Sequence, residues 1–217
     1  MNADVTAKHI PAAFTALIAL WFVSLAWSGW APYDRATWWL EVAPCFMALV
    51  LMWWTRKTFE LTTMLYWLIA IHGLILILGG AYTYARVPLG FWMQDWFGFT
   101  RNNYDKIGHF AQGFIPAIVA REVLIRKFAI TRRGVVAFLC IAICLGFSAF
   151  YELIEWWSAL IMGQGADEFL GTQGDQWDTQ SDMFFALIGA SCALVSLSRW
   201  HDRQMEALTF ATESPGN

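Results

Sequence analysis

Acidic side chains and one histidine recur at helical spacing in three separate segments of the chain. Asp105, His109 and Gln112 are spaced i, i+4 and i+7, so a helix would carry them on one face. Glu152 and Glu155 lie about one turn apart in a second segment. A third segment contains three acids at intervals of three and four residues, Asp175, Asp178 and Asp182. Carboxylates and an imidazole suit a divalent metal such as Mn, Fe or Zn, and a bound metal can turn water into a nucleophile.

The chain around these residues is strongly apolar. Of its 217 residues, 58% are hydrophobic and only 14% are charged, whereas about a quarter are charged in a soluble domain. This composition excludes a disordered chain, a collagen and a small disulfide-stapled domain, and it indicates a polytopic membrane protein. The net charge of −3 argues against nucleic acid as a partner.

Six segments are apolar enough and long enough to cross a bilayer, which takes about 20 residues. We predict an all-α transmembrane helix bundle that forms one domain over residues 1–217, with spans at about 10–30, 38–54, 61–82, 105–124, 135–157 and 183–198. The fourth span is the weakest, because its uncharged stretch runs only from Ile107 to Ala120. The first could instead be a signal peptide cleaved near Ala26, but its apolar run is long for that, which favours an uncleaved span.

Basic residues are distributed unevenly between the two sides of this bundle. Ten of the 14 lysines and arginines fall on the side that holds both termini, five of them between Arg121 and Arg133. None occurs between Gly134 and Ser198. Because positive residues concentrate in cytoplasmic loops, both termini are predicted to be cytoplasmic.

This orientation brings the three acidic segments to one level. Asp105 enters the fourth span from the outside, and His109 lies about 6 Å deeper at a helical rise of 1.5 Å per residue. Glu152 lies about 25 Å from the cytoplasmic start of the fifth span, so that it and Glu155 approach the outer boundary. Asp182 opens the sixth span from the outside. We therefore predict one polar site at the extracytoplasmic rim.

The predicted site contains the groups that acid–base or metal chemistry needs. Catalytic roles are assigned to Asp105, His109, Glu152 and Glu155. Binding of a divalent metal ion is assigned to His109, Glu152, Glu155, Asp178 and Asp182. Substrate binding is assigned to Lys106, Arg101 and Gln112, with the two cations holding an anionic headgroup.

Three functions are compatible with these residues. The favoured one is a metal-dependent hydrolase or transferase that acts on a lipid-linked or envelope substrate. The second is a small proton-coupled transporter with His72 as a deeper relay, although the chain contains no inverted repeat. The third is a structural or interaction protein whose acids face water, with Asp105 and Asp182 stabilising helix N-termini.

Two further features lie outside the predicted site. The segment from Phe91 to Phe97 is too short to span a bilayer and too apolar to be free in water, so we predict that it lies in the outer interface and caps the site. His201 is expected at the cytoplasmic end of the last span, where it indicates no function.

Three motifs give the chain a resemblance to a known family. The runs Tyr104–Phe110, Tyr151–Trp157 and Gly174–Met183 resemble the YjdF-like family of bacterial inner-membrane proteins. The resemblance implies a multi-pass protein of the inner membrane and no established activity. A fainter similarity links Asp105–Phe110 and the acids before the last span to the VanZ-like membrane proteins. Those proteins have an asparagine where this chain has Ala186, so the similarity extends to the architecture and not to this position.

Overall fold

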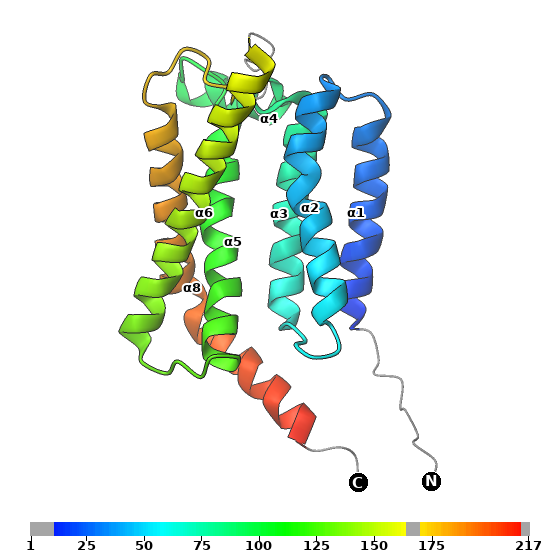
Figure 1. Cartoon of the computed structure of the whole chain (residues 1–217), viewed down its shortest axis with the longest axis vertical. Coiled ribbons are helices and arrows are strands. Elements are labelled where there is room, and N and C mark those ends of the chain that lie inside the picture. The colour runs from blue at the N-terminus through cyan, green and yellow to red at the C-terminus, as the bar shows by residue number, and fades with distance from the viewer. Residues whose placement is uncertain (1–10, 164–169, 214–217) are drawn as a thin grey trace.

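The computed structural model of the chain describes residues 11–163 and 170–213, and the regular structure in these ranges is entirely helical (Figure 1). The helices are α1 (Ala12–Trp30), α2 (Arg35–Thr55), α3 (Thr63–Tyr82), α4 (Pro88–Phe97), α5 (Tyr104–Arg126), α6 (Arg133–Met162) and α8 (Asp178–Glu213), with a 3₁₀ turn, η1, at Tyr84–Arg86. The all-α prediction is therefore confirmed for the described residues.

Five of these helices, α1, α2, α3, α6 and α8, are long and apolar enough to cross a membrane. The remaining predicted span corresponds to α5, whose 23 residues reach about 35 Å at 1.5 Å per residue. Its composition is too polar for it to count among the five, because charged side chains occupy both of its ends. The exact number of six spans therefore stays a prediction.

The long helices form two groups that meet along α3 and α5. Helices α1 and α2 pack on α3, whereas α6 and α8 pack on α5 and on each other (Figure 1). We call the end where α5 and α8 begin the distal end, and the end where α1 begins and α8 ends the proximal end. Since α5 runs from the distal to the proximal end, it connects both ends of the bundle.

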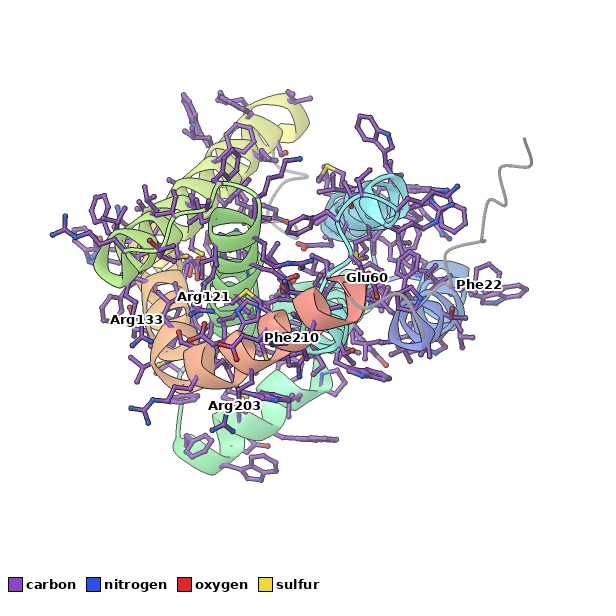
Figure 2. The ribbon with its side chains drawn as sticks, turned by 90° about the horizontal axis from the view of Figure 1, so that it is seen from below. Phe22, Glu60, Arg121, Arg133, Arg203 and Phe210 are labelled. Carbon is purple, nitrogen blue, oxygen red and sulfur yellow. The ribbon has the colours of Figure 1, made fainter. Side chains whose placement is uncertain are left out.

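Helix α8 continues well past the predicted end of the last span. It contains 36 residues and reaches Glu213, whereas hydropathy predicts an end near residue 198. The last part carries charged residues such as Arg203 and crosses beneath the proximal end of the bundle (Figure 2). It remains packed because His201 and Met205 are buried against the other helices.

Helices α5 and α8 approach each other closely because glycines line their contact. A Cβ atom added at Gly113 of α5 would lie 1.8 Å from the carbonyl oxygen of Ala186. In the reverse direction, a Cβ atom at Gly189 of α8 would lie 2.1 Å from the carbonyl oxygen of Phe110. The missing side chains let the two backbones touch, which brings polar side chains on both helices within bonding distance of each other.

Candidate functional site

Polar side chains from three helices and two connecting segments gather at the distal end. We call this group the distal cluster, and its members are Arg101, Asp105, Lys106, His109, Glu152, Glu155, Asp175, Asp178 and Asp182. The first turns of α5 and α8 and the distal part of α6 carry most of them. The structure thus brings together the acids and the histidine that the sequence predicts to share one level.

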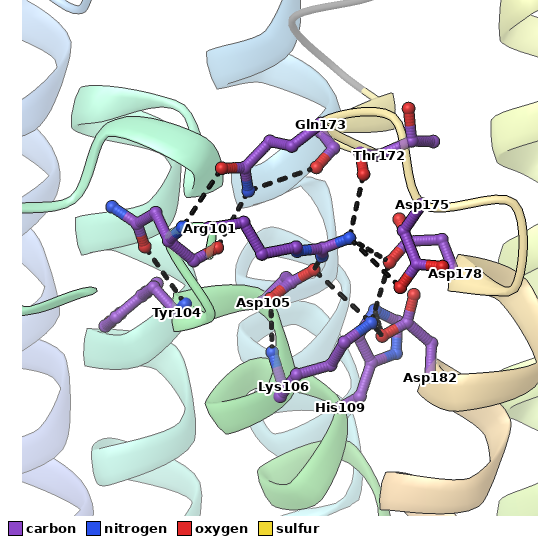
Figure 3. Close-up of polar contacts among 12 residues, drawn as sticks. Arg101, Tyr104, Asp105, Lys106, His109, Thr172, Gln173, Asp175, Asp178 and Asp182 are labelled. Carbon is purple, nitrogen blue, oxygen red and sulfur yellow. Dashed lines mark hydrogen bonds and ion pairs between the residues drawn. The ribbon is translucent and has the colours of Figure 1, made fainter. Parts of the chain in front are cut away.

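Two cations hold the aspartates of this cluster (Figure 3). Lys106 Nζ lies 2.7 Å from Asp178 Oδ1 and 2.7 Å from Asp182 Oδ1, and 3.5 Å from Asp105 Oδ2. Arg101 pairs with Asp105, and its Nη1 lies 2.9 Å from Asp178 Oδ1. Both cations are therefore neutralised within the cluster.

Arg101 lies in the segment before α5, and its charge depends on these neighbours. Burial disfavours its charged form, but the carboxylates of Asp105 and Asp178 outweigh this effect and raise the pKa of the guanidinium above its ordinary value. Its Nη1 also donates to the carbonyl oxygen of Thr172 at 2.8 Å. The guanidinium Nε, in contrast, is buried without a hydrogen-bond partner among the described residues.

His109, Glu152 and Glu155 form a second group beside these ion pairs. One potential ligand atom from each side chain lies within 4.8 Å of the other two. His109 and Glu152 are buried, and Glu155 is partly buried. Asp105, Asp178 and Asp182 meet the same criterion, but the ammonium of Lys106 already lies among them. Of the two groups, the His109 group is therefore the one whose carboxylates are not already neutralised by a lysine, so it is the one that can bind a metal ion.

Two details prepare the His109 group for a ligand. His109 Nδ1 lies 2.9 Å from Gln112 Oε1, and an amide oxygen can only accept, so Nδ1 carries a proton and the neutral ring has its lone pair on Nε2. Metal-bound histidines are commonly oriented by such a bond from the other ring nitrogen. Glu152 Oε1 is buried and has no hydrogen-bond partner among the described residues. An unpartnered buried carboxylate oxygen is costly unless something binds it.

The structure leaves the predicted roles of these residues as predictions, but it separates them by environment. The five predicted metal ligands divide into the His109 group and the lysine-bound pair of Asp178 and Asp182. The predicted substrate-binding groups Lys106 and Arg101 are paired with carboxylates, and Gln112 contacts His109. The pairing of Lys106 with both α8 aspartates could not be read from spacing, since it depends on the close contact of α5 and α8.

A second buried polar group at the proximal end escaped the sequence analysis. We call it the proximal cluster, and its members are Thr62, Arg121, Glu122, Arg126, His201 and Asp202. Glu122 is fully buried and accepts from the Thr62 hydroxyl at 2.8 Å. Its other partners are Arg126 and His201 Nε2, the latter at 2.8 Å.

His201, to which the sequence analysis assigned no function, is a central member of this cluster. Its ring is fully buried, between Arg121 and Glu122 of α5. Because a guanidinium can only donate, His201 Nδ1 accepts from Arg121 at 3.0 Å and Nε2 donates to Glu122. The only feature of the sequence that indicates this buried cluster is that Arg121 and Glu122 are charged residues within the predicted fourth span.

Spacing along the sequence also gave no sign that Glu41, a buried glutamate of α2, lies next to α6 of the site. Glu41 is buried, and Tyr151 Oη donates to its Oε2 at 3.3 Å. Tyr151 directly precedes Glu152 on α6, so this bond links α2 to the helix that carries two of the site's acids.

Comparison with known proteins assigns the chain to a family. Residues 13–203 match the family described as "Predicted membrane protein (DUF2238)". The chain belongs to this family. One relative of this chain is "Inner membrane protein YjdF" of Escherichia coli (strain K12). The two proteins are 53% identical over 188 residues, which cover 87% of this chain and 90% of that protein. No solved structure matches the chain.

The comparison confirms the resemblance to the YjdF-like proteins and the prediction of a multi-pass membrane protein. The name of the E. coli relative agrees with the predicted inner-membrane location. The comparisons do not show the fainter resemblance to the VanZ-like proteins. Since the family description gives no activity, the distal cluster is the best guide to function in this DUF2238 protein.

Proposed function

We propose that this chain is a six-span inner-membrane protein that binds a divalent metal ion through His109, Glu152 and Glu155. The bound ion would support hydrolysis or group transfer on a lipid-linked or envelope substrate at the extracytoplasmic rim. The observation that carries this proposal is the buried oxygen of Glu152, which has no partner among the described residues and belongs to the His109 group.

The proposed topology rests on the placement of charges. The connection between α5 and α6 lies at the proximal end and contains Lys127 and Arg132, and the helix ends beside it carry Arg126 and Arg133. This excess of positive charge favours a cytoplasmic location for that end. The distal end would then be extracytoplasmic. Helix α5 would be the sixth span, with its polar residues tolerated because α3, α6 and α8 surround it.

The charge balance of the distal cluster favours a cation. Two permanent cations, Arg101 and Lys106, face six carboxyl groups, those of Asp105, Asp175, Asp178, Asp182, Glu152 and Glu155. Two carboxylates 4 Å apart repel each other by about 4 kcal/mol at an effective dielectric constant of 20. A divalent ion held by Glu152 and Glu155 would remove this repulsion without disturbing the ion pairs of the aspartates.

The donor set determines which ions and which chemistry fit. One imidazole nitrogen and carboxylate oxygens suit Mn, Fe or Zn. Asp182 Oδ1 lies 3.5 Å from His109 Nε2, so Asp182 is close enough to join as a further ligand. Such an ion would lower the pKa of a bound water, which could then attack an ester or phosphoryl group. Asp105 would assist by fixing Arg101, whose unpartnered Nε is the donor left for an anionic headgroup.

Metal analysis of purified protein tests this proposal. The wild-type protein, dialysed against Mn²⁺ or Zn²⁺ and freed of excess metal, should retain one equivalent per chain. The double variant His109→Ala, Glu152→Ala should retain almost none. Glu206→Gln, at an exposed glutamate of the proximal end, is the matched control and should bind like the wild type. Equal, near-zero metal in all three proteins would contradict the proposal.

A further inference from the structure

Helix α4 presents an aromatic face that none of the other helices in the described part of the chain covers. Trp92 and Trp96 lie one turn apart, with ring centroids separated by 6.4 Å, and Phe91 and Phe97 are exposed as well. Trp96 is 68% exposed and Phe97 is 66% exposed. With ten residues, α4 is about 15 Å long at 1.5 Å per residue, which is half of a bilayer core.

The position of α4 favours lipid as the neighbour of this face. The helix lies across the distal end, between the end of α3 and the start of α5 (Figure 1), and to one side of the bundle rather than over its centre (Figure 2). Exposed tryptophans occur at the same end where α1 ends, at Trp30, and where α2 begins, at Trp39. Tryptophan is enriched at the headgroup level of a bilayer, so α4 continues an aromatic belt.

The other face of α4 is fixed to the distal cluster. Asn102 Nδ2 donates to the carbonyl oxygen of Val87, the residue before α4, at 3.0 Å. Gly90 is the buried residue of α4, and a Cβ atom there would lie 1.6 Å from Asn102 Oδ1. Asn102 follows Arg101 and lies two residues before Tyr104, where α5 begins, so the orientation of α4 is coupled to the first residues of the site.

The same asparagine is bound by the segment before α8. Gln173 Oε1 accepts from the backbone N–H of Asn102 at 3.1 Å, and its Nε2 donates to the Asn102 carbonyl oxygen at 2.7 Å (Figure 3). Gln173 adopts a φ of 49°, an unfavourable conformation for a residue other than glycine. Its side chain therefore ties α4, α5 and the segment leading to α8 into one unit at the distal end.

From these observations we infer that α4 is an interfacial helix whose aromatic face lies in the lipid leaflet at the distal end. Through Asn102 and Gln173, it holds the distal cluster at the level of the lipid headgroups. A site held at that level takes a substrate that the leaflet itself presents, which is a lipid headgroup or a lipid-linked group. This last point rests on the proposed function, whereas the docking of α4 on lipid does not.

Site-directed fluorescence quenching tests the position of α4. Trp96→Cys is combined with Cys192→Ser, since Cys192 is exposed whereas Cys45, Cys140 and Cys144 are buried. The protein is labelled with bimane and reconstituted into vesicles of phosphatidylethanolamine and phosphatidylglycerol that carry nitroxides on the headgroup, near the top of the acyl chain or near its end. The control label is Gln176→Cys, at an exposed polar residue in the segment before α8.

We expect nitroxides on the headgroup and at the top of the chain to quench the label at residue 96 severalfold more than the nitroxide at the chain end. The control label should respond to iodide in the water and not to the chain nitroxides. If the label at residue 96 behaves like the control, α4 faces water and the inference is wrong. If neither lipid nitroxides nor iodide quench it, a second copy or another protein covers α4, which also overturns the inference.

The same samples separate this inference from the proposed function. Quenching does not depend on metal, so an interfacial α4 in a protein that binds no metal would reject the metal site alone. In Asn102→Ala, the label at residue 96 should still be quenched by the nitroxides at the headgroup and at the top of the chain. The electron paramagnetic resonance signal of bound Mn²⁺ should broaden, because the variant removes the hydrogen bond from Asn102 to Val87 that connects α4 to the site. An unchanged signal in Asn102→Ala would show that α4 does not hold the site.

Discussion

The distal and proximal clusters both bury charged side chains where α5 meets α8, but they differ in how these charges are paired. In the proximal cluster, Glu122 is bound by four donor groups, which are the backbone N–H and the hydroxyl of Thr62 and the side chains of Arg126 and His201. The basic residues around it are bound as well. In the distal cluster, carboxyl groups outnumber cations, and Glu152 Oε1 lacks a partner among the described residues. Buried polar groups in a purely structural network are normally satisfied.

The comparison therefore separates two roles on one helix. The proximal cluster has the features of an interhelical tie, because its acids and bases satisfy each other. The distal cluster has the features of a binding site, because part of its charge is left for a ligand. Substitutions that remove one paired charge should therefore destabilise the protein at either end, but only at the distal end should an added divalent cation restore stability.

The largest effect is expected for Glu122→Gln in the proximal cluster. Removal of one member of a buried ion pair leaves the others uncompensated and typically costs about 3–5 kcal/mol. Since Arg126 and His201 would both lose their charged partner, we expect a loss of this size in the free energy of unfolding. Unfolding of the purified protein by denaturant measures it, and added Mn²⁺ should not restore it. A loss below about 1 kcal/mol would mean that the proximal cluster is not a tie.

A slightly smaller loss, about 3 kcal/mol, is expected for Lys106→Met in the distal cluster. Asp178 and Asp182 would lose their shared partner, although Arg101 would still pair with Asp178. In contrast to the proximal variant, added Mn²⁺ should restore part of the stability, because a second cation can occupy the place of the ammonium. The midpoint of thermal unfolding with and without Mn²⁺ checks this, and the absence of any rescue would contradict an acid-rich binding site.

Glu152→Gln should leave the metal-free protein as stable as the wild type, because Glu152 has no ion-pair partner among the described residues and its Oε1 accepts no hydrogen bond there. Its effect should appear only with metal. A ligand at 100 times its dissociation constant stabilises the folded state by about 2.7 kcal/mol, and we expect the variant to lose this gain. Unfolding curves with and without Mn²⁺ measure the difference. If Mn²⁺ does not stabilise the wild-type protein, the distal cluster does not differ from the proximal cluster in metal binding, and the prediction is wrong.

Asp34 provides a reference for an acid that belongs to neither cluster. It precedes α2 and accepts from the backbone N–H of Thr37 at 2.7 Å, which lowers the pKa of its carboxyl group below the ordinary value of 3.8. Asp34→Ala should cost about 1 kcal/mol, as for other N-terminal caps. The contribution should be complete at neutral pH and disappear as the pH falls below 3.8, since a lowered pKa stabilises the folded state only above the unfolded value. Unfolding of both proteins at pH 7 and pH 3 checks this difference.

The sequence predicts most of the helices because hydropathy and periodicity act locally. Helix α3, for example, ends at Tyr82 as predicted, and the three acidic segments converge because orientation and helical rise fix their depth. The end of α8 could not be predicted, since its last part is held by tertiary contacts of His201 and Met205 rather than by an apolar run.

The pairing within each cluster depends on which helices touch, and spacing along the chain does not contain that information. Lys106 reaches Asp178 and Asp182 across 72 and 76 residues of sequence, through a contact that Gly113 and Gly189 permit. His201 reaches Glu122 across 79 residues. Asp105, which could have been a helix cap, is instead paired with Arg101, and Asn103 precedes the first turn of α5.

A structure determined with Mn²⁺ and recorded at the manganese absorption edge tests the central claim most directly. An anomalous difference map should contain one peak at the distal cluster, between His109 Nε2 and Glu152 Oε1 and within reach of Glu155. The proximal cluster should contain none, because its charges are already paired. No peak at the distal cluster, or a peak beside Glu122 instead, would contradict the assignment of binding to one end of α5 and structural support to the other.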